Sequence, residues 1–372
     1  MKKIAMILLC ICLLLTGCSW MDGSYVSVTP HVVTRDPESD DTAQISTYSQ
    51  LRNALTDMVD AGTTHGLFSL IDYPQEQVTT DLNMAISYVK WNYPIGAYAV
   101  EDIEYEYGSG ATPNVLRVDI SYLHGKSEIN RIQTVRGITG AQSAIASALR
   151  QCSNSLVLQV TNYTATDFAQ LTADYAAEHP QNVMETPQVT YAIYPGSGDV
   201  RVVELVFSYQ TSRESLRSMQ ASVMPIFSSA QLYVTGNTGD YTKFSQLYTF
   251  LTERFDYTIE TSITPSYSLL CHGVGDSRAF AQVYAAMCRQ VGLECLVVSG
   301  TRDGVSHFWN IVLDEEIYYH VDLLRNVEEG AYRQRTDEEM QGYVWDYSAY
   351  PACGIPAQDP SATGETQHDP AE

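Results

Sequence analysis

A histidine and an aspartate near the C-terminal end of the chain are residue types that can perform acid–base chemistry. His307 and Asp322 each lie within a short β-strand pattern, and both follow a helix expected to open at 273–276 (Gly-Val-Gly-Asp). A helix start that faces a histidine and an aspartate is the apparatus of thiol catalysis. The helix dipole and an imidazolium stabilise a thiolate, and the carboxylate orients the imidazole.

Local patterns predict the elements that must position these side chains. Apolar residues spaced i, i+3, i+4 and i+7 predict a helix over 277–290, buried along one face, with Gly292 as its stop. Three strand-like runs follow at 294–299, 306–313 and 317–323, separated by short turn-forming segments. We therefore expect a helix whose N-terminus faces a sheet.

These residues resemble the transglutaminase-like superfamily, which has a papain-like fold. The family pattern runs Gly-Val-Cys-x-x-x-Ala-x-Ala-Phe, then His-x-Trp-Asn on a strand, then a Tyr-rich strand that ends in Asp. The matching positions here are Gly273, Val274, Ala279, Ala281, 292–295, 307–310 and 318–322. By this resemblance the catalytic histidine and aspartate carry over to His307 and Asp322. Counted back from Ala279, the family's cysteine falls on Gly275.

Two nearby residues could substitute for the missing thiol. Cys271 precedes Gly275 by four residues of non-helical chain, which can displace a group by roughly 10 Å or more at ~3.3 Å per residue. A nucleophile must lie within about 3 Å of its base, so Cys271 would serve only if the chain doubled back. Ser277 follows Gly275 by two residues, so its side chain is rotated roughly 200° around the helix from the position of the family's cysteine. We therefore assign it a capping role.

The same residues have structural interpretations. His307 hydrogen-bonded to Asp322 could be a buried polar pair that only stabilises the sheet. Asp276 and Trp309 are expected to line the cleft beside that pair. A metal site would draw on His272, His307, His320 and Asp276. These residues do not have a recognised ligand spacing, so we predict neither a metal nor another cofactor.

The N-terminus has the features of an exported lipoprotein. Lys2 and Lys3 precede an apolar run at 4–15, which is too short for a membrane-spanning helix of about 20 residues and predicts a signal peptide over 1–17. The tetrapeptide at 15–18 (Leu-Thr-Gly-Cys) resembles a bacterial lipobox, which implies a lipid on Cys18. An ordinary secretory signal is the alternative. We expect a flexible tether over 18–46 and a disordered acidic tail over 354–372.

Charge and cysteine usage restrict the partners and the compartment. The net charge of −23 argues against nucleic acid and anionic lipid as partners. Without the signal peptide and Cys18, five cysteines remain: Cys152, Cys271, Cys288, Cys295 and Cys353. Outside the cell any two of these could form a disulfide, but the sequence does not assign the pairing.

The middle of the chain contains a weak internal repeat. Asp81-Leu82, Pro94 and Tyr105 recur 86 residues later as Asp167-Phe168, Pro180 and Tyr191. Each copy predicts a helix, a strand, a helix, two alternating strands and a polar helical segment. The predicted units are α/β modules over 47–135 and 136–237 and a transglutaminase-like domain over 238–353, which together make an α+β protein. Tyrosines of the modules could stack on sugars or peptides, or could be ordinary strand residues.

These observations predict a membrane-anchored extracytoplasmic protein, non-catalytic, that holds a peptide or cell-wall ligand in a transglutaminase-like cleft. The first alternative is an amide hydrolase or acyl transferase that uses Cys271 with His307 and Asp322. The second alternative is a structural protein of the cell envelope. The oligomeric state is left open.

Overall fold

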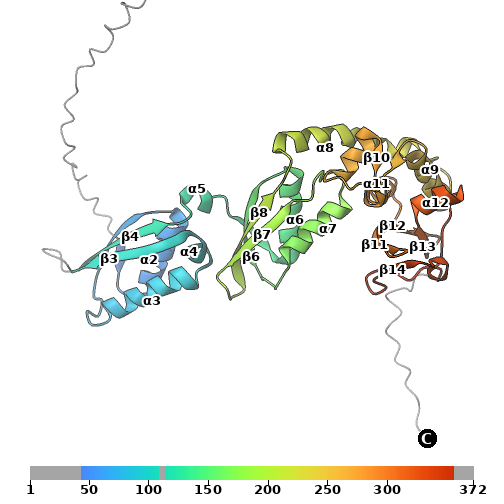
Figure 1. Cartoon of the computed structure of the whole chain (residues 1–372). Coiled ribbons are helices and arrows are strands. Elements are labelled where there is room, and N and C mark those ends of the chain that lie inside the picture. Colours follow the sequence, from blue (N-terminus) through green and yellow to red (C-terminus); the bar gives the residue numbers. More distant parts are fainter. Residues whose placement is uncertain (1–42, 109–113, 356–372) are drawn as a thin grey trace, which may run out of the picture.

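The computed structural model describes residues 43–108 and 114–355, in which three units follow one another along the chain (Figure 1). The predicted signal peptide, Cys18, most of the tether and nearly all of the tail lie outside these residues. The fold is α+β, with helices packed on three four-stranded sheets. Within the described ranges, no helix has both the length and the apolar character that a membrane crossing requires.

The first unit is a four-stranded sheet with its helices packed on it. Its strand order is β1-β2-β4-β3, in which β1 runs parallel to β2 and the other neighbours are antiparallel. Its elements are β1 (Ala43–Ile45), α2 (Tyr48–Ala61), β2 (His65–Leu70), α3 (Val78–Trp91), α4 (Pro94–Ala99), β3 (Val100–Tyr107), β4 (Val115–Tyr122) and α5 (Lys126–Ile129). Buried aliphatic side chains such as Leu51, Leu82 and Val118 form its core.

The second unit has the same topology. Its strand order is β5-β6-β8-β7, again with a parallel first pair and antiparallel neighbours beyond it. Its elements are β5 (Gln133–Arg136), α6 (Gly137–Arg150), β6 (Ser155–Thr161), α7 (Phe168–Glu178), β7 (Gln188–Tyr194) and β8 (Val200–Ser208). The two units meet at a small cluster in which Tyr98 and Ile129 of the first lie with Val202 of the second.

Three predicted boundaries differ from the structure. The tether was expected to reach residue 46, but Ala43–Ile45 pair with β2 as an edge strand. The first unit was expected to reach residue 135, but Gln133–Arg136 pair with β6 and belong to the second sheet. At the other end, the backbone N–H of Gly354 donates to Tyr318 at 2.8 Å, so the first residue of the predicted tail is attached to the last unit.

The third unit packs a central helix against an antiparallel sheet of order β13-β12-β11-β14. Its elements are α9 (Asp240–Thr252), β9 (Asp256–Tyr257), α10 (Pro265–Tyr267), the π-helical turn η2 (Ser268–His272), β10 (Val274–Gly275), α11 (Ser277–Gln290), β11 (Cys295–Arg302), β12 (Val305–Asp314), β13 (Ile317–Val321), α12 (Leu323–Glu329), η3 (Asp337–Glu339) and β14 (Tyr343–Trp345). The predicted helix and its three strands are thus present, with strand ends shifted by a few residues.

Helix α11 is the buried axis of this unit. It begins where the side chain of Asp276 accepts the backbone N–H of Ala279 at 2.8 Å, an N-cap that satisfies a free donor of the first turn. The residues at 279–288 are buried, and several of them are alanines, which lets neighbouring elements approach closely. The helix ends before Gly292, whose φ of 78° requires a residue without a side chain.

The core of the third unit begins before residue 238, where the sequence placed its start. Helix α8 (Arg213–Ser228) and the turn η1 (Ser229–Leu232) bury Leu216, Val223 and Phe227 in the same cluster as α9 and α11. The sequence predicted a polar helical segment here, which was assigned to the second unit. Figure 1 shows α8 running from the second unit to the third.

Candidate functional site

His307 and Asp322 form a buried hydrogen-bonded pair. His307 lies on β12, and Asp322 directly follows β13 as the N-cap of α12, where its Oδ1 accepts the backbone N–H groups of Leu324 and Arg325. The Nε2 of His307 lies 2.8 Å from Oδ2 of Asp322. The two residues are 7% and 1% exposed. The structure therefore brings together the histidine and aspartate that the sequence singled out.

Asp322 has more donors than the sequence indicated. Tyr343 on β14 donates its hydroxyl to Oδ2 at 2.6 Å, and a guanidinium nitrogen of Arg302 lies 3.9 Å from the same atom. Burial by itself would raise the pKa of Asp322, but the hydrogen bond and charge of His307 and the hydrogen bond from Tyr343 lower it below the ordinary value. Asp322 is therefore an ionised carboxylate.

The ionised carboxylate determines which ring nitrogen of His307 can act as a base. A carboxylate only accepts hydrogen bonds, so Nε2 of His307 carries the proton that it donates to Asp322. In a neutral imidazole the other nitrogen, Nδ1, then has a free lone pair. Nδ1 is the atom of this pair that could take a proton from a substrate or a nucleophile.

A second histidine is used for structure. The indole N–H of Trp309 donates to Nδ1 of His320 at 2.9 Å, and Nε2 of His320 lies 2.8 Å from Asp337. Because indole is only a donor, Nε2 must carry the proton of His320, which it gives to Asp337. Trp309 was expected to line the cleft, but it is 0% exposed and lies inside this hydrogen-bonded chain.

The hydrogen bonds of His320 also decide whether the metal ligands considered from the sequence could bind an ion. His320, Asp337 and Cys353 have ligand atoms within 4.8 Å of one another. A metal on Nε2 of His320 would have to displace its proton while Trp309 keeps Nδ1 occupied, so the arrangement fits a hydrogen-bond relay better than a metal site. Of the other candidates, His307 binds Asp322, Asp276 caps α11, and His272 lies at the end of η2.

Gly275, the predicted nucleophile position, has no room for a side chain. A side chain built there would place its Cβ 2.9 Å from Cβ of Ala279 and 3.0 Å from Cδ1 of Leu269. Those atoms belong to the first turn of α11 and to η2, which close around the glycine. A cysteine at this position would therefore meet helix atoms before it met β12.

Ser277 lies at the other side of the helix start. Its hydroxyl accepts the backbone N–H of Phe308, the residue after His307, at 3.3 Å, and its side chain is buried. The capping role expected for Ser277 is performed by Asp276. Of the two positions at the helix start, Ser277 is thus the one whose side chain meets β12.

Cys271, the proposed substitute, does not join the site. It lies on η2 with an exposed side chain, and partial burial raises the pKa of its thiol. Among the residues described, its sulfur makes no hydrogen bond to His307. A thiol with a raised pKa is a poor nucleophile near neutral pH.

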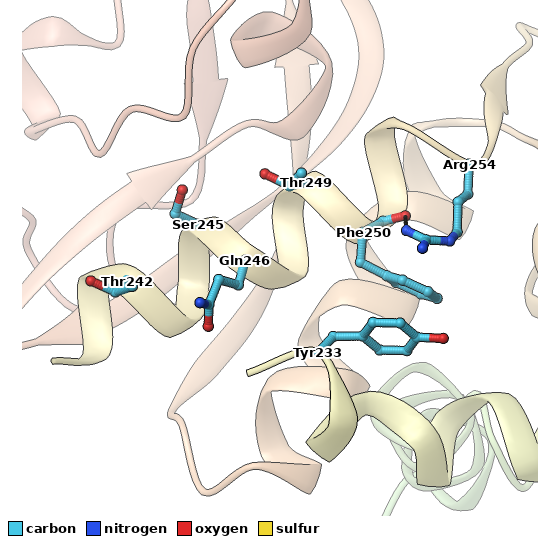
Figure 2. A pocket seen from close by; sticks show the side chains of 7 residues that line it. All are labelled: Tyr233, Thr242, Ser245, Gln246, Thr249, Phe250 and Arg254. Atoms are coloured by element: carbon cyan, nitrogen blue, oxygen red, sulfur yellow. Dashed lines mark hydrogen bonds between the residues drawn. The ribbon is translucent and has the colours of Figure 1, made fainter. Parts of the chain in front are cut away.

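A shallow cavity of about 300 Å³ lies elsewhere, along α9 (Figure 2). Its lining residues are Tyr233, Thr242, Ser245, Gln246, Thr249, Phe250 and Arg254. The guanidinium of Arg254 lies 4.6 Å from the ring centroid of Phe250, which packs against the tilted ring of Tyr233. These lining residues include no acid–base pair, so His307 and Asp322 remain the candidates for acid–base catalysis.

Comparisons with known proteins place the last unit in a family. Residues 228–323 match the sequence model of the transglutaminase-like superfamily. No curated protein matches the chain. The start of the match at residue 228, at the end of α8, agrees with a domain core that begins before residue 238.

Three solved structures are similar at low identity. The first, described as a TGase, is 10% identical with a TM-score of 0.27; the match covers 54% of this chain and 57% of that one. A candidate cysteine protease from Cytophaga hutchinsonii is 11% identical with a TM-score of 0.26, over 42% and 70% of the two chains. A candidate protease from Parabacteroides distasonis is 9% identical with a TM-score of 0.23, over 57% and 47%. This chain thus spans little more than half of the first.

Proposed function

Because its C-terminal unit is a transglutaminase-like domain, we propose that this protein is a lipid-anchored extracytoplasmic protein that binds peptide or cell-wall amides without thiol chemistry. The observation that carries the proposal is the identity of the residue at the helix start. Ser277, not a cysteine, meets the strand of His307. The histidine and the carboxylate that would orient an amide remain in place.

The proposed location rests on the N-terminal sequence. Lys2 and Lys3, the apolar run at 4–15 and the lipobox-like tetrapeptide that ends at Cys18 support export and lipid attachment. An anchored protein of this kind meets the peptide cross-links of a cell wall, which offer amide groups of the type that the family recognises.

Binding is tested by sedimentation with purified peptidoglycan, either intact or stripped of its stem peptides by an amidase. The full chain should sediment with the intact material and remain soluble with the stripped glycan. Ser277→Trp should abolish sedimentation by filling the helix start, whereas Ser222→Trp, at an exposed position of α8, serves as the control for a tryptophan outside the site. Equal sedimentation with both materials would contradict recognition of the peptide.

A second candidate function has its own observation. When the imidazole of His307 is neutral and donates Nε2–H to Asp322, its Nδ1 can accept a proton, and the hydroxyl of Ser277 contacts the adjoining residue. The two could therefore act as base and nucleophile in amide hydrolysis or acyl transfer. A fluorophosphonate probe distinguishes the two functions. Labelling of Ser277 that is lost in His307→Ala would establish the catalytic alternative, and absence of labelling supports binding alone.

A further inference from the structure

Two cysteines of the third unit lie on either side of one tight turn. Cys288 is in the last turn of α11, and Cys295 is the first residue of β11. The backbone N–H of Leu293 donates to the carbonyl of Cys288 at 3.0 Å, and the guanidinium of Arg289 donates to the carbonyl of Cys295 at 3.4 Å. The chain therefore folds back so that β11 begins beside the end of the helix.

The two side chains enter the same buried environment. Cys288 is 0% and Cys295 is 3% exposed, and both belong to the main core of the unit. Complete burial raises the pKa of the Cys288 thiol, and a hydrogen bond with the thiol of Cys295 raises it further. In the structure both are free thiols, which share one buried core where the end of α11 meets the start of β11.

We propose that Cys288 and Cys295 are joined by a disulfide in the exported protein. The inference rests on the extracytoplasmic location proposed above, because thiols persist in the cytosol and oxidise outside it. The other cysteines are placed differently. Cys271 is exposed on η2, and Cys353 lies in a separate core cluster beneath β14.

The bond must form while the chain folds, because the folded core excludes an oxidant. The thiolate of one cysteine attacks the disulfide of a thiol–disulfide oxidoreductase and gives a mixed disulfide. The thiolate of the other cysteine then displaces the enzyme's sulfur. The protein loses two protons and two electrons, and the oxidoreductase leaves as a dithiol.

Such a bond would fasten the end of α11 to the sheet that carries the site. Ser277 begins the helix, and His307 lies on β12, which pairs with β11 throughout its length. A cross-link reduces the freedom of the unfolded chain between the two cysteines and so favours the folded state. It holds α11 in place against β11 without using any residue of the site.

Tryptic peptides from the full chain test the pairing. The protein is extracted from membranes in denaturant with N-ethylmaleimide, so that buried free thiols are blocked as well, and is digested without reduction once the denaturant is diluted. Trypsin cleaves at Arg278, Arg289 and Arg302, so a disulfide would join the peptides 279–289 and 290–302. Mass spectrometry should detect the joined pair and its separation by a reductant. Maleimide on both peptides would show that the extracted protein has no such bond, and refolding then decides whether the pairing or the exported location is wrong.

A refolding experiment tests the disulfide between Cys288 and Cys295 independently of whether the protein is exported. The reduced, unfolded chain is refolded in a mixture of oxidised and reduced glutathione, and the same peptides are measured. A bond after refolding but not in extracted protein would overturn the exported location while supporting the pairing, and a bond in neither would overturn the pairing. Reductant should lower the melting temperature of the wild type and of Cys152→Ser by several degrees, but not that of Cys288→Ser.

Discussion

Ser277 touches the strand of the candidate base at Phe308, whose backbone N–H its hydroxyl accepts at 3.3 Å. Gly275, two residues earlier, is enclosed by Ala279 and Leu269. The residue that could act with His307 is therefore the one whose side chain contacts β12, which is Ser277. This contact distinguishes two positions that a motif alone does not separate.

We expect Ser277→Cys to create a reactive thiol and Gly275→Cys to create none. At Ser277 the sulfur would lie at the start of α11, against the strand of His307, where the helix dipole and an imidazolium lower a thiol's pKa. At Gly275 the Cβ would crowd Ala279, with an expected loss of about 1–3 kcal/mol of stability.

Alkylation by iodoacetamide near neutral pH provides the measurement. Ser277→Cys should react quickly, and the added His307→Ala change should slow it, while the wild type should label only at exposed Cys271. Faster reaction of Gly275→Cys than of Ser277→Cys would contradict the assignment. Rapid wild-type labelling of Cys271 that depends on His307 would instead favour Cys271 as the nucleophile.

Tyr343→Phe should destabilise the third unit. The change removes a 2.6 Å hydrogen bond to a carboxylate that is 1% exposed, and bonds to charged groups contribute about 1.5–3 kcal/mol. Denaturant unfolding measures the loss. Tyr347→Phe is a matched control because Tyr347 is 62% exposed. An equal loss in both variants would show that the bond to Asp322 contributes nothing.

Stability should decrease as the pH falls below about 6.5, the ordinary pKa of histidine. Burial lowers the pKa of His320 in the folded protein, so the unfolded chain binds a proton more readily in that range. The stability contribution is therefore complete above the unfolded pKa and is lost as the pH falls toward the folded one. Burial has the same effect on His179.

Urea unfolding at pH 7.5 and pH 5.5 compares the two histidines. His320→Gln should be less stable at both values and should lose part of the pH dependence. His179→Gln should remove a separate part, because His179 follows α7 in the second unit. A wild type that is equally stable at both pH values would contradict the lowered pKa of both residues.

Cys18→Ala should release the protein from membranes or block its processing, because the proposed lipid is attached to that sulfur. Fractionation of cells that express the variant gives the measurement, and Cys152→Ala, a buried cysteine of the second unit, is the control. Membrane association that is unchanged in Cys18→Ala would remove the proposed lipid anchor.

Local pattern predicted those parts of the fold that have a strong period. The helix at 277–290 has the expected ends and the two alternating strands of each module are present, because helical spacing and alternation were uninterrupted there. The edge strands β1 and β5 were missed because three or four residues are too few to show a period. The destination of α8 was missed because the segment was taken as polar, whereas Leu216, Val223 and Phe227 are buried in the core of the third unit.

The candidate site was predicted in part for similar reasons. His307 and Asp322 stand in clear strand patterns and match the family motif, and the structure joins them by a hydrogen bond. Tyr343 was not found, because its hydrogen bond spans 21 residues and its strand has only three. The role of Ser277 depends on where Asp276 starts the helix, which a motif count cannot determine to within two residues.

Because α8 belongs to the cores of both the second and the third unit, the first unit is more independent of the rest of the chain than the third unit is. The first unit meets the second through a small cluster around Tyr98. The second and third have a common interior, since Cys152 and Met184 of the middle unit lie in the same cluster as Leu216 and Phe227 of α8. Limited proteolysis should therefore detach the first unit as a stable fragment, whereas a cut before α9 would leave the last unit with an open flank.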